Sequence, residues 1–128
     1  MKKTIFVAGN PLVEEDSLAL EIVEKLEGKL AGIKFKELNS LGELETIPDD
    51  LYIIDVAKGI EKIEVLRDLN KLDSIKLVSA HDLDLGTELL LYRKLGKLGN
   101  VCIFAVPLGC ELEKAVSEMA GLLEKEFG

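Results

Sequence analysis

Short apolar runs bounded by glycine, proline or acidic residues are the first pattern along the chain. Runs of this length that are rich in valine and isoleucine are typical of strands buried on both faces. Four of them occur, at residues 4–8, 51–54, 76–80 and 101–106. A fifth segment, 33–38, alternates apolar and charged residues. This alternation predicts a strand at a sheet edge with one face in solvent.

Amphipathic helices are predicted between these strands. In residues 17–26 the apolar side chains recur at the spacing of one helix face, and Gly28 is a suitable end for that helix. The same spacing recurs over residues 112–123, and a third helix is predicted over 87–95, ended by Gly96. Strands and helices therefore alternate along most of the chain.

Residues 60–72 fit two interpretations. Ile63 and Val65 alternate with charged residues as in a strand, whereas Leu66, Leu69 and Asn70 have the spacing of a helical turn. The pattern leaves both open for this segment.

Alternating strands and helices predict an α/β fold. The expected architecture is three layers, α/β/α, around a mainly parallel, twisted sheet of about five strands. The length of 128 residues suits one domain over residues 1–128, and the chain shows no internal repeat, low-complexity tract or linker.

Charge and composition narrow the function. The formal charge of −8, without a basic run or stripe, argues against binding to nucleic acid or to an anionic membrane. No apolar stretch approaches the ~18 residues of a membrane span. The two cysteines match no metal-ligand spacing, and we expect them to be reduced in a cytoplasmic protein, with Cys102 in the core.

Candidate chemistry lies just after the apolar runs, because ligands of open α/β sheets bind beyond the carboxyl ends of the strands. Asp16, or its neighbour Glu15, follows the first run, Asp55 follows the run 51–54, and His81 follows the run 76–80. Two carboxylates and an imidazole are a nitrogen–oxygen ligand set suited to Ni²⁺ or Zn²⁺. The three positions together predict a metal-contacting site at one rim of the sheet.

Each of these residues also has a structural interpretation. Acids at a helix N-terminus, such as Glu15 and Asp16, cap backbone N–H groups. Asp55 could start a turn, and His81 could be a solvated loop residue. Other chemistries have no support, since the chain has no phosphate-binding glycine pattern, no Gly-x-Ser-x-Gly turn and no cysteine that pairs convincingly with the histidine.

The order of these motifs resembles that of the nickel–iron hydrogenase maturation endopeptidases. The resemblance spans essentially the whole chain, and its parts are Gly9-Asn10-Pro11-Leu12, Glu15-Asp16, Asp55 after an apolar strand, Ser79-Ala80-His81, and the last strand and loop with Glu111-Leu112-Glu113. It implies a phosphorylase/hydrolase-like α/β/α protein that removes the C-terminal extension of a hydrogenase large-subunit precursor. That precursor is the implied partner.

By the same resemblance, Asp16, Asp55 and His81 contact nickel that the precursor supplies, and the enzyme needs no cofactor of its own. Another divalent metal could substitute for nickel in vitro. Ser17-Leu18-Ala19 stand where the family has glycines, so the choice between Glu15 and Asp16 stays open. The expected mechanism is attack by a water that either the metal or a carboxylate activates.

Two other functions remain open. A phosphoacceptor receiver domain would use Glu15, Asp16, Asp55 and Ser79, but it needs a lysine where this chain has Val106-Pro107-Leu108, and it gives His81 no role. A non-catalytic chaperone that binds nickel or the precursor would keep the same residues without turnover.

Overall fold

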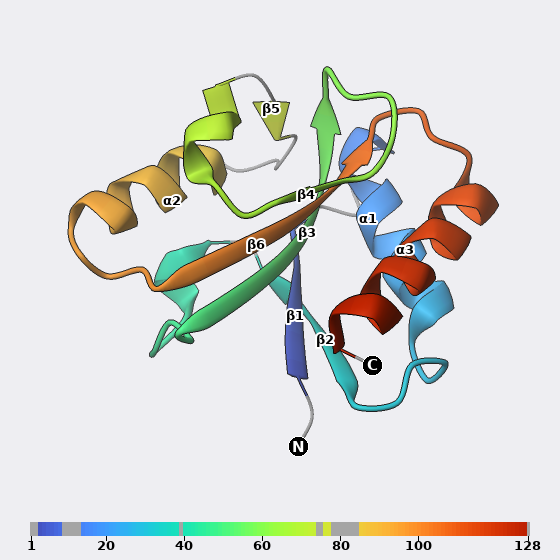
Figure 1. The fold of residues 1–128 in the computed structure, drawn as a ribbon, viewed down its shortest axis with the longest axis horizontal. Coiled ribbons are helices and arrows are strands. Elements are labelled where there is room, and N and C mark those ends of the chain that lie inside the picture. The colour runs from blue at the N-terminus through green and yellow to red at the C-terminus, as the bar shows by residue number, and fades with distance from the viewer. Residues whose placement is uncertain (1–2, 9–13, 39, 74–75, 78–84, 128) are drawn as a thin grey trace.

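A computed structural model describes residues 3–8, 14–38, 40–73, 76–77 and 85–127, with the backbone alone described at 14–16, 72–73 and 76. The chain forms a mixed sheet between two layers of helices, as expected (Figure 1). Five strands follow the order β2-β1-β3-β6-β4, and β5 pairs with β3 beside this path. In chain order the elements are β1 (Lys3–Ala8), α1 (Glu14–Leu26), β2 (Ile33–Leu38), the 3₁₀ helix η1 (Leu41–Glu43), β3 (Asp50–Lys58), β4 (Glu64–Leu66), the 3₁₀ helix η2 (Leu69–Asp73), β5 (Lys76–Leu77), α2 (Leu85–Lys94), β6 (Asn100–Pro107) and α3 (Leu112–Phe127).

The central strands are parallel and the added ones are not. β1 pairs in parallel with β2 and β3, and β3 pairs in parallel with β6, whereas β4 and β5 are antiparallel to their neighbours. The prediction of a mainly parallel sheet is confirmed. The strand order also differs from the 2-1-3-4-5 order of doubly wound receiver domains. In this chain β6 lies beside β3, and the antiparallel strand β4 forms the edge beyond β6.

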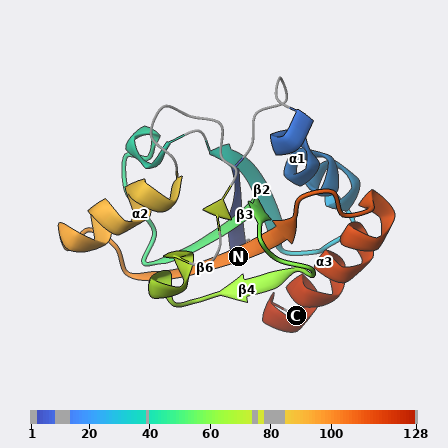
Figure 2. The same ribbon diagram turned by 90° about the horizontal axis from the view of Figure 1, so that it is seen from above.

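Each face of the sheet packs against its own helices. Ile54 and Val56 of β3 lie in the core with α1 and α3, whereas Ile53 and Ala57 lie in the core with α2 and both 3₁₀ helices. Strand residues alternate between faces, so this division follows from the pleat. Figure 2 shows α1 and α3 together on one side of the sheet and α2 on the other.

The helix boundaries confirm the glycine signals. α1 and α2 end shortly before Gly28 and Gly96, whose φ angles of 80° and 74° lie in the left-handed region that glycine adopts without strain. α1 begins at Glu14, before the predicted residue 17, and α2 begins at Leu85, before the predicted residue 87. The three acids at the start of α1 favour its earlier beginning, because acidic residues complement the positive end of the helix dipole.

One strand prediction needs correction, and another is described only in part. The run 51–54 is part of a longer strand that continues to Lys58, because β6 pairs alongside it as far as Pro107. The run 76–80 is described only at Lys76 and Leu77, where it forms the short antiparallel β5. The ambiguous segment contains both predicted structures, the strand β4 and then the helical turn η2.

The edge-strand prediction for residues 33–38 is confirmed. β2 lies at one edge of the sheet, and the charged Lys34, Lys36 and Glu37 are exposed. None of the helices in the described part of the chain is long and apolar enough to cross a bilayer.

Candidate functional site

Asp55 lies inside β3 and is completely buried. Its position alternates with Ile54 and Val56, so its side chain faces the same side of the sheet as Ile53 and Ala57, the side that α2 covers. Its Oδ1 accepts a 2.8 Å hydrogen bond from the backbone N–H of Val56. The expectation that Asp55 follows the end of its strand is wrong, and so is the turn alternative, since the strand continues for three more residues.

The end of β1 nevertheless brings Asp55 to the rim of the sheet. Phe6 and Val7 pair with Ile53 and Ile54, so Ala8, the last residue of β1, reaches the level of Asp55. Beyond that level β1 no longer flanks β3. The carboxylate therefore lies at the carboxyl edge of one neighbouring strand although it is in the interior of its own.

β5 takes the place beside β3 that β1 leaves. Leu77 pairs with Ala57 and Lys76 with Lys58, antiparallel to β3, so the chain in β5 runs back toward the level of Asp55. Residues 78–84, which connect β5 to α2, include Ser79 and His81 and lie outside the described residues. The connection therefore starts at Leu77, opposite a position two residues from Asp55.

Asp16 lies in the first turn of α1, as its position after β1 predicts. Its side chain, like that of Glu15, is outside the described part of the chain. Whether these acids cap α1 or reach toward Asp55 thus stays a prediction. Among the described side chains no group of three or more His, Cys, Asp or Glu residues is arranged to hold a metal ion, and of the expected ligands that set includes only Asp55.

Glu88 is a second buried carboxylate, which the sequence interpretation missed. It lies on α2, is 5% exposed, and accepts hydrogen bonds from Ser40 Oγ (2.8 Å) and from the Leu41 N–H (3.3 Å). The hydroxyl of Ser40 in turn accepts from the Gly42 N–H at 3.1 Å. Glu88 thereby fastens α2 to the loop that follows β2. Its sequence signal was available, because residue 88 shares a helix face with the buried residues 85 and 89.

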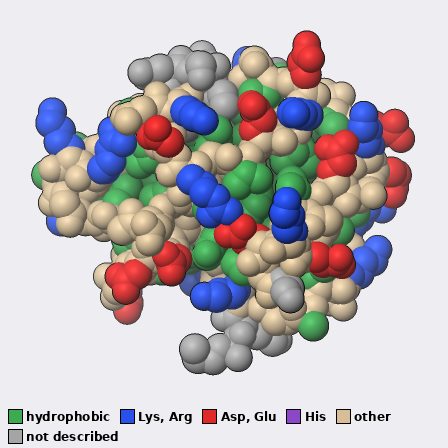
Figure 3. Space-filling view, in the orientation of Figure 1, with side chains coloured by type: hydrophobic (Ala, Val, Ile, Leu, Met, Phe, Trp, Pro, Cys, Tyr) green, Lys and Arg blue, Asp and Glu red, His purple; other side chains and the backbone are tan. Residues whose placement is uncertain are grey.

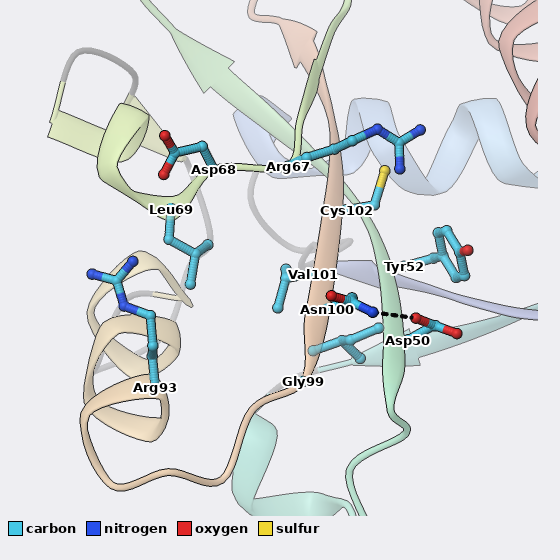
Figure 4. A pocket seen from close by; sticks show the side chains of 11 residues that line it. Asp50, Tyr52, Arg67, Asp68, Leu69, Arg93, Gly99, Asn100, Val101 and Cys102 are labelled. Carbon is cyan, nitrogen blue, oxygen red and sulfur yellow. Dashed lines mark hydrogen bonds between the residues drawn. The ribbon is translucent and has the colours of Figure 1, made fainter.

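A separate cavity of about 360 Å³ lies at the amino ends of β3 and β6 (Figure 4). It is lined by Asp50, Leu51, Tyr52, Arg67, Asp68, Leu69, Arg93, Gly99, Asn100, Val101 and Cys102. Asp50 and Asp55 are five residues apart in β3, which is about 16 Å along a strand. The cavity is therefore distinct from the surroundings of Asp55.

The charged side chains that line this cavity already have partners, and the thiol that lines it is protonated. The guanidinium of Arg67 forms a 2.6 Å ion pair with Glu126, and Asp50 accepts a 3.0 Å hydrogen bond from Asn100. Burial raises the pKa of the Cys102 thiol to about 11, so it is protonated at neutral pH and is a poor nucleophile. Cys102 is a core residue, as predicted, and the cavity offers no evident catalytic group.

Comparison with known proteins gives one informative match. No protein-family model matches the chain, and no curated protein is similar to it in sequence. A solved structure described as an endopeptidase from Escherichia coli shares its fold, with a TM-score of 0.59 over 96% of this chain and 90% of the other. Because the two chains are only 19% identical, the similarity shows that they share the three-layer α/β/α fold and nothing beyond the fold.

Proposed function

We propose that this chain is an endopeptidase that removes the C-terminal extension from the nickel-loaded precursor of a hydrogenase large subunit. The observation that carries the proposal is the buried carboxylate of Asp55, placed where β1 ends and where β5 leads into the segment with His81. The order of motifs along the chain supports it. So does the fold shared with an E. coli endopeptidase.

Asp55 has the properties of a ligand for a cation that arrives with the substrate. Burial lowers the effective dielectric constant around the carboxylate and so strengthens its attraction to a divalent ion. The Val56 N–H holds Oδ1 at 2.8 Å and thereby orients the carboxylate. In the proposed complex Asp55, Asp16 and His81 contact the nickel of the precursor, with Glu15 as the alternative to Asp16.

Contact between these residues and the nickel of the precursor would place the scissile peptide bond beside the site. Holding the substrate in this way replaces a bimolecular encounter with an oriented, effectively unimolecular reaction. Hydrolysis adds the oxygen of water to the carbonyl carbon, breaks the C–N bond and delivers a proton to the leaving amine. Either a carboxylate acting as general base or the metal activates the water.

The test follows the mass of a nickel-loaded large-subunit precursor from the same source after it is mixed with the protein. We expect loss of a short C-terminal peptide with wild-type protein, dependence on nickel, and no cleavage with Asp55→Asn or His81→Ala. Asparagine retains an oxygen that can accept from Val56, so Asp55→Asn should fold.

The matched control is Glu64→Gln. Glu64 pairs with Ala105 in β6, the same residue that pairs with Asp55 from the other side. The Glu64→Gln substitution therefore removes a carboxylate at the level of Asp55 but two strands away from it, and it should leave cleavage intact. A precursor that stays uncleaved by wild-type protein, although another maturation enzyme processes it, would contradict the proposal. Binding without cleavage would instead indicate the chaperone function.

A further inference from the structure

Helix α2 carries apolar side chains on two sides. Leu85 and Leu89 are buried against the sheet, at 3% and 0% exposure. Leu91 and Leu95 lie one turn apart on a different flank and are 45% and 58% exposed. A surface helix normally has one apolar stripe and a polar outer face. The second stripe is therefore not explained by the core of this chain.

Basic residues surround this exposed stripe. Arg93, Lys94 and Lys97 are all exposed, and no acidic residue occurs from Leu89 to Cys110. Lys94 lies three residues after Leu91, on the same flank of the helix. The acid that precedes this stretch in the sequence, Glu88, is buried and accepts a hydrogen bond from Ser40. Residues 89–98 thus carry a charge of +3 in a chain of net charge −8, and they include the two exposed leucines.

Stabilisation of the helix accounts for only part of this pattern. Cations in the last turn complement the helix dipole, and this applies to Arg93 and Lys94. Lys97 lies beyond the end of α2, and exposed leucines gain nothing from a dipole. Figure 3 shows Lys and Arg side chains at the end of the molecule that α2 forms in Figure 1.

The placement of α2 relates this surface to the candidate site. α2 covers the face of the sheet toward which Asp55 points, and it begins directly after the segment with His81. The surface itself is at the other end of α2, where Arg93 lines the cavity at the amino ends of β3 and β6. Because a ten-residue helix is about 15 Å long, a protein substrate bound at the candidate site is large enough to contact this surface as well.

We infer that the α2 surface, defined as Leu91, Arg93, Lys94, Leu95 and Lys97, is the docking site for the protein substrate. This inference rests on the proposed function and adds the chemistry of recognition. The surface fits a segment of the precursor in which acidic side chains flank exposed apolar ones. Apolar contact supplies the affinity, and the three cations select and orient the acidic partner.

The charges also distinguish this occupant from others. A symmetric dimer through the same patch would bring the three cations of one copy close to the three cations of the other, which is unfavourable. An anionic membrane would meet the repulsion of the whole molecule at −8.

The experiment measures the Kd of the nickel-loaded precursor for wild-type protein and for two variants, Lys94→Glu/Lys97→Glu and Leu91→Ser/Leu95→Ser. The control, Lys114→Glu/Lys125→Glu, makes the same charge change at exposed positions of α3, on the opposite face of the sheet. We expect about tenfold weaker binding for each α2 variant, unchanged binding for the control, and a loss of wild-type affinity as salt rises.

Kinetic measurements on the same proteins separate this inference from the proposed function. If cleavage occurs, the α2 variants should raise KM and leave kcat unchanged. Wild-type binding without cleavage would overturn the proposed function, while the Kd values still test the docking surface. Equal Kd values for wild-type protein and both α2 variants would overturn the docking inference, as would absence of wild-type binding.

Two further outcomes would assign the surface to another occupant and overturn the inference. One is a wild-type dimer in sedimentation that the α2 variants dissociate. The other is binding to phosphatidylserine vesicles that the α2 variants lose while they still bind the precursor normally.

Discussion

Asp55 and Glu88 are the buried charged side chains of the described chain, and they differ in their surroundings. Burying a carboxylate is costly unless hydrogen bonds or a cation compensate. Glu88 accepts from Ser40 and Leu41, groups far from it in sequence, so it joins two parts of the fold. Oδ1 of Asp55 accepts from the adjacent Val56 N–H, and the residue lies at the level where β1 ends and toward which β5 leads. The partners of Glu88 indicate a structural role, whereas the position of Asp55 is the basis of its proposed role as a ligand.

At the residue scale we predict that Cys102 reacts slowly with alkylating reagents. Burial raises its thiol pKa from 9.0 to about 11, so its thiolate fraction at pH 8 falls about 100-fold. The greater nucleophilicity of a more basic thiolate recovers about tenfold of this loss. Cys102 is also only 3% exposed, whereas Cys110 is partly exposed.

Mass spectrometry of iodoacetamide labelling should therefore show Cys102 reacting at least about tenfold more slowly than Cys110 at pH 8. The sign of the pH effect follows from the raised pKa: labelling of Cys102 should accelerate as pH approaches 11. The Cys110→Ser variant should lose the fast phase. Equal rates for both cysteines in folded protein at pH 8 would contradict the prediction.

At the element scale, the start of the β3–β6 pair depends on a glycine. The register begins at Asp50 and Asn100, and the Asn100 N–H donates to the Asp49 carbonyl at 2.8 Å. A Cβ placed on Gly99 would lie only 2.4 Å from that carbonyl oxygen. Since the oxygen belongs to the backbone, relief of this contact would require the two strands to separate.

We therefore predict that Gly99→Ala lowers the free energy of unfolding by about 1–3 kcal/mol. Gly121→Ala is the matched control, because Gly121 lies within α3 and a Cβ there meets nothing within 4 Å. Alanine is the better helix former by up to about 1 kcal/mol, so this variant should be more stable than wild type. Urea unfolding measures both, and a Gly99→Ala protein as stable as wild type would contradict the strand-contact argument.

At the scale of the whole molecule, net charge opposes the compact state. The described ion pairs, Lys25–Glu113 and Arg67–Glu126, are exposed or partly exposed. Such pairs contribute up to about 1 kcal/mol each. The excess of acidic residues, by contrast, repels itself across the entire surface.

We predict that added NaCl raises the free energy of unfolding by an amount on the order of 1 kcal/mol. This increase is expected as the NaCl concentration rises from about 0.01 M to about 0.1 M, because the screening length then falls from about 30 Å to about 10 Å. The variant Glu27→Lys/Glu124→Lys changes two exposed acids and moves the net charge from −8 to −4, so it should respond less to salt. Thermal unfolding over this range is the measurement, and destabilisation of wild-type protein by salt would indicate that ion pairs dominate.

Hydrophobic periodicity alone determined the α/β class, the three helices and the edge strand at residues 33–38. These features depend on local spacing, and helix and strand periods differ enough to be distinguished in a single chain. Helix ends at Gly28 and Gly96 were likewise predictable, because only glycine reaches the left-handed region without strain. The residues after the apolar runs also identified Asp55 as a candidate.

Only the tertiary structure decided the direction of β4 and β5, the full length of β3, and the partners of Glu88. Direction depends on which distant strand a segment pairs with, and a three-residue strand such as β4 has no periodicity that encodes its neighbour. Asp55 seemed to end its strand because a carboxylate interrupts the apolar run. Pairing with β6 carries the strand past it, and long-range pairing of this kind is a property of the folded chain rather than of local sequence.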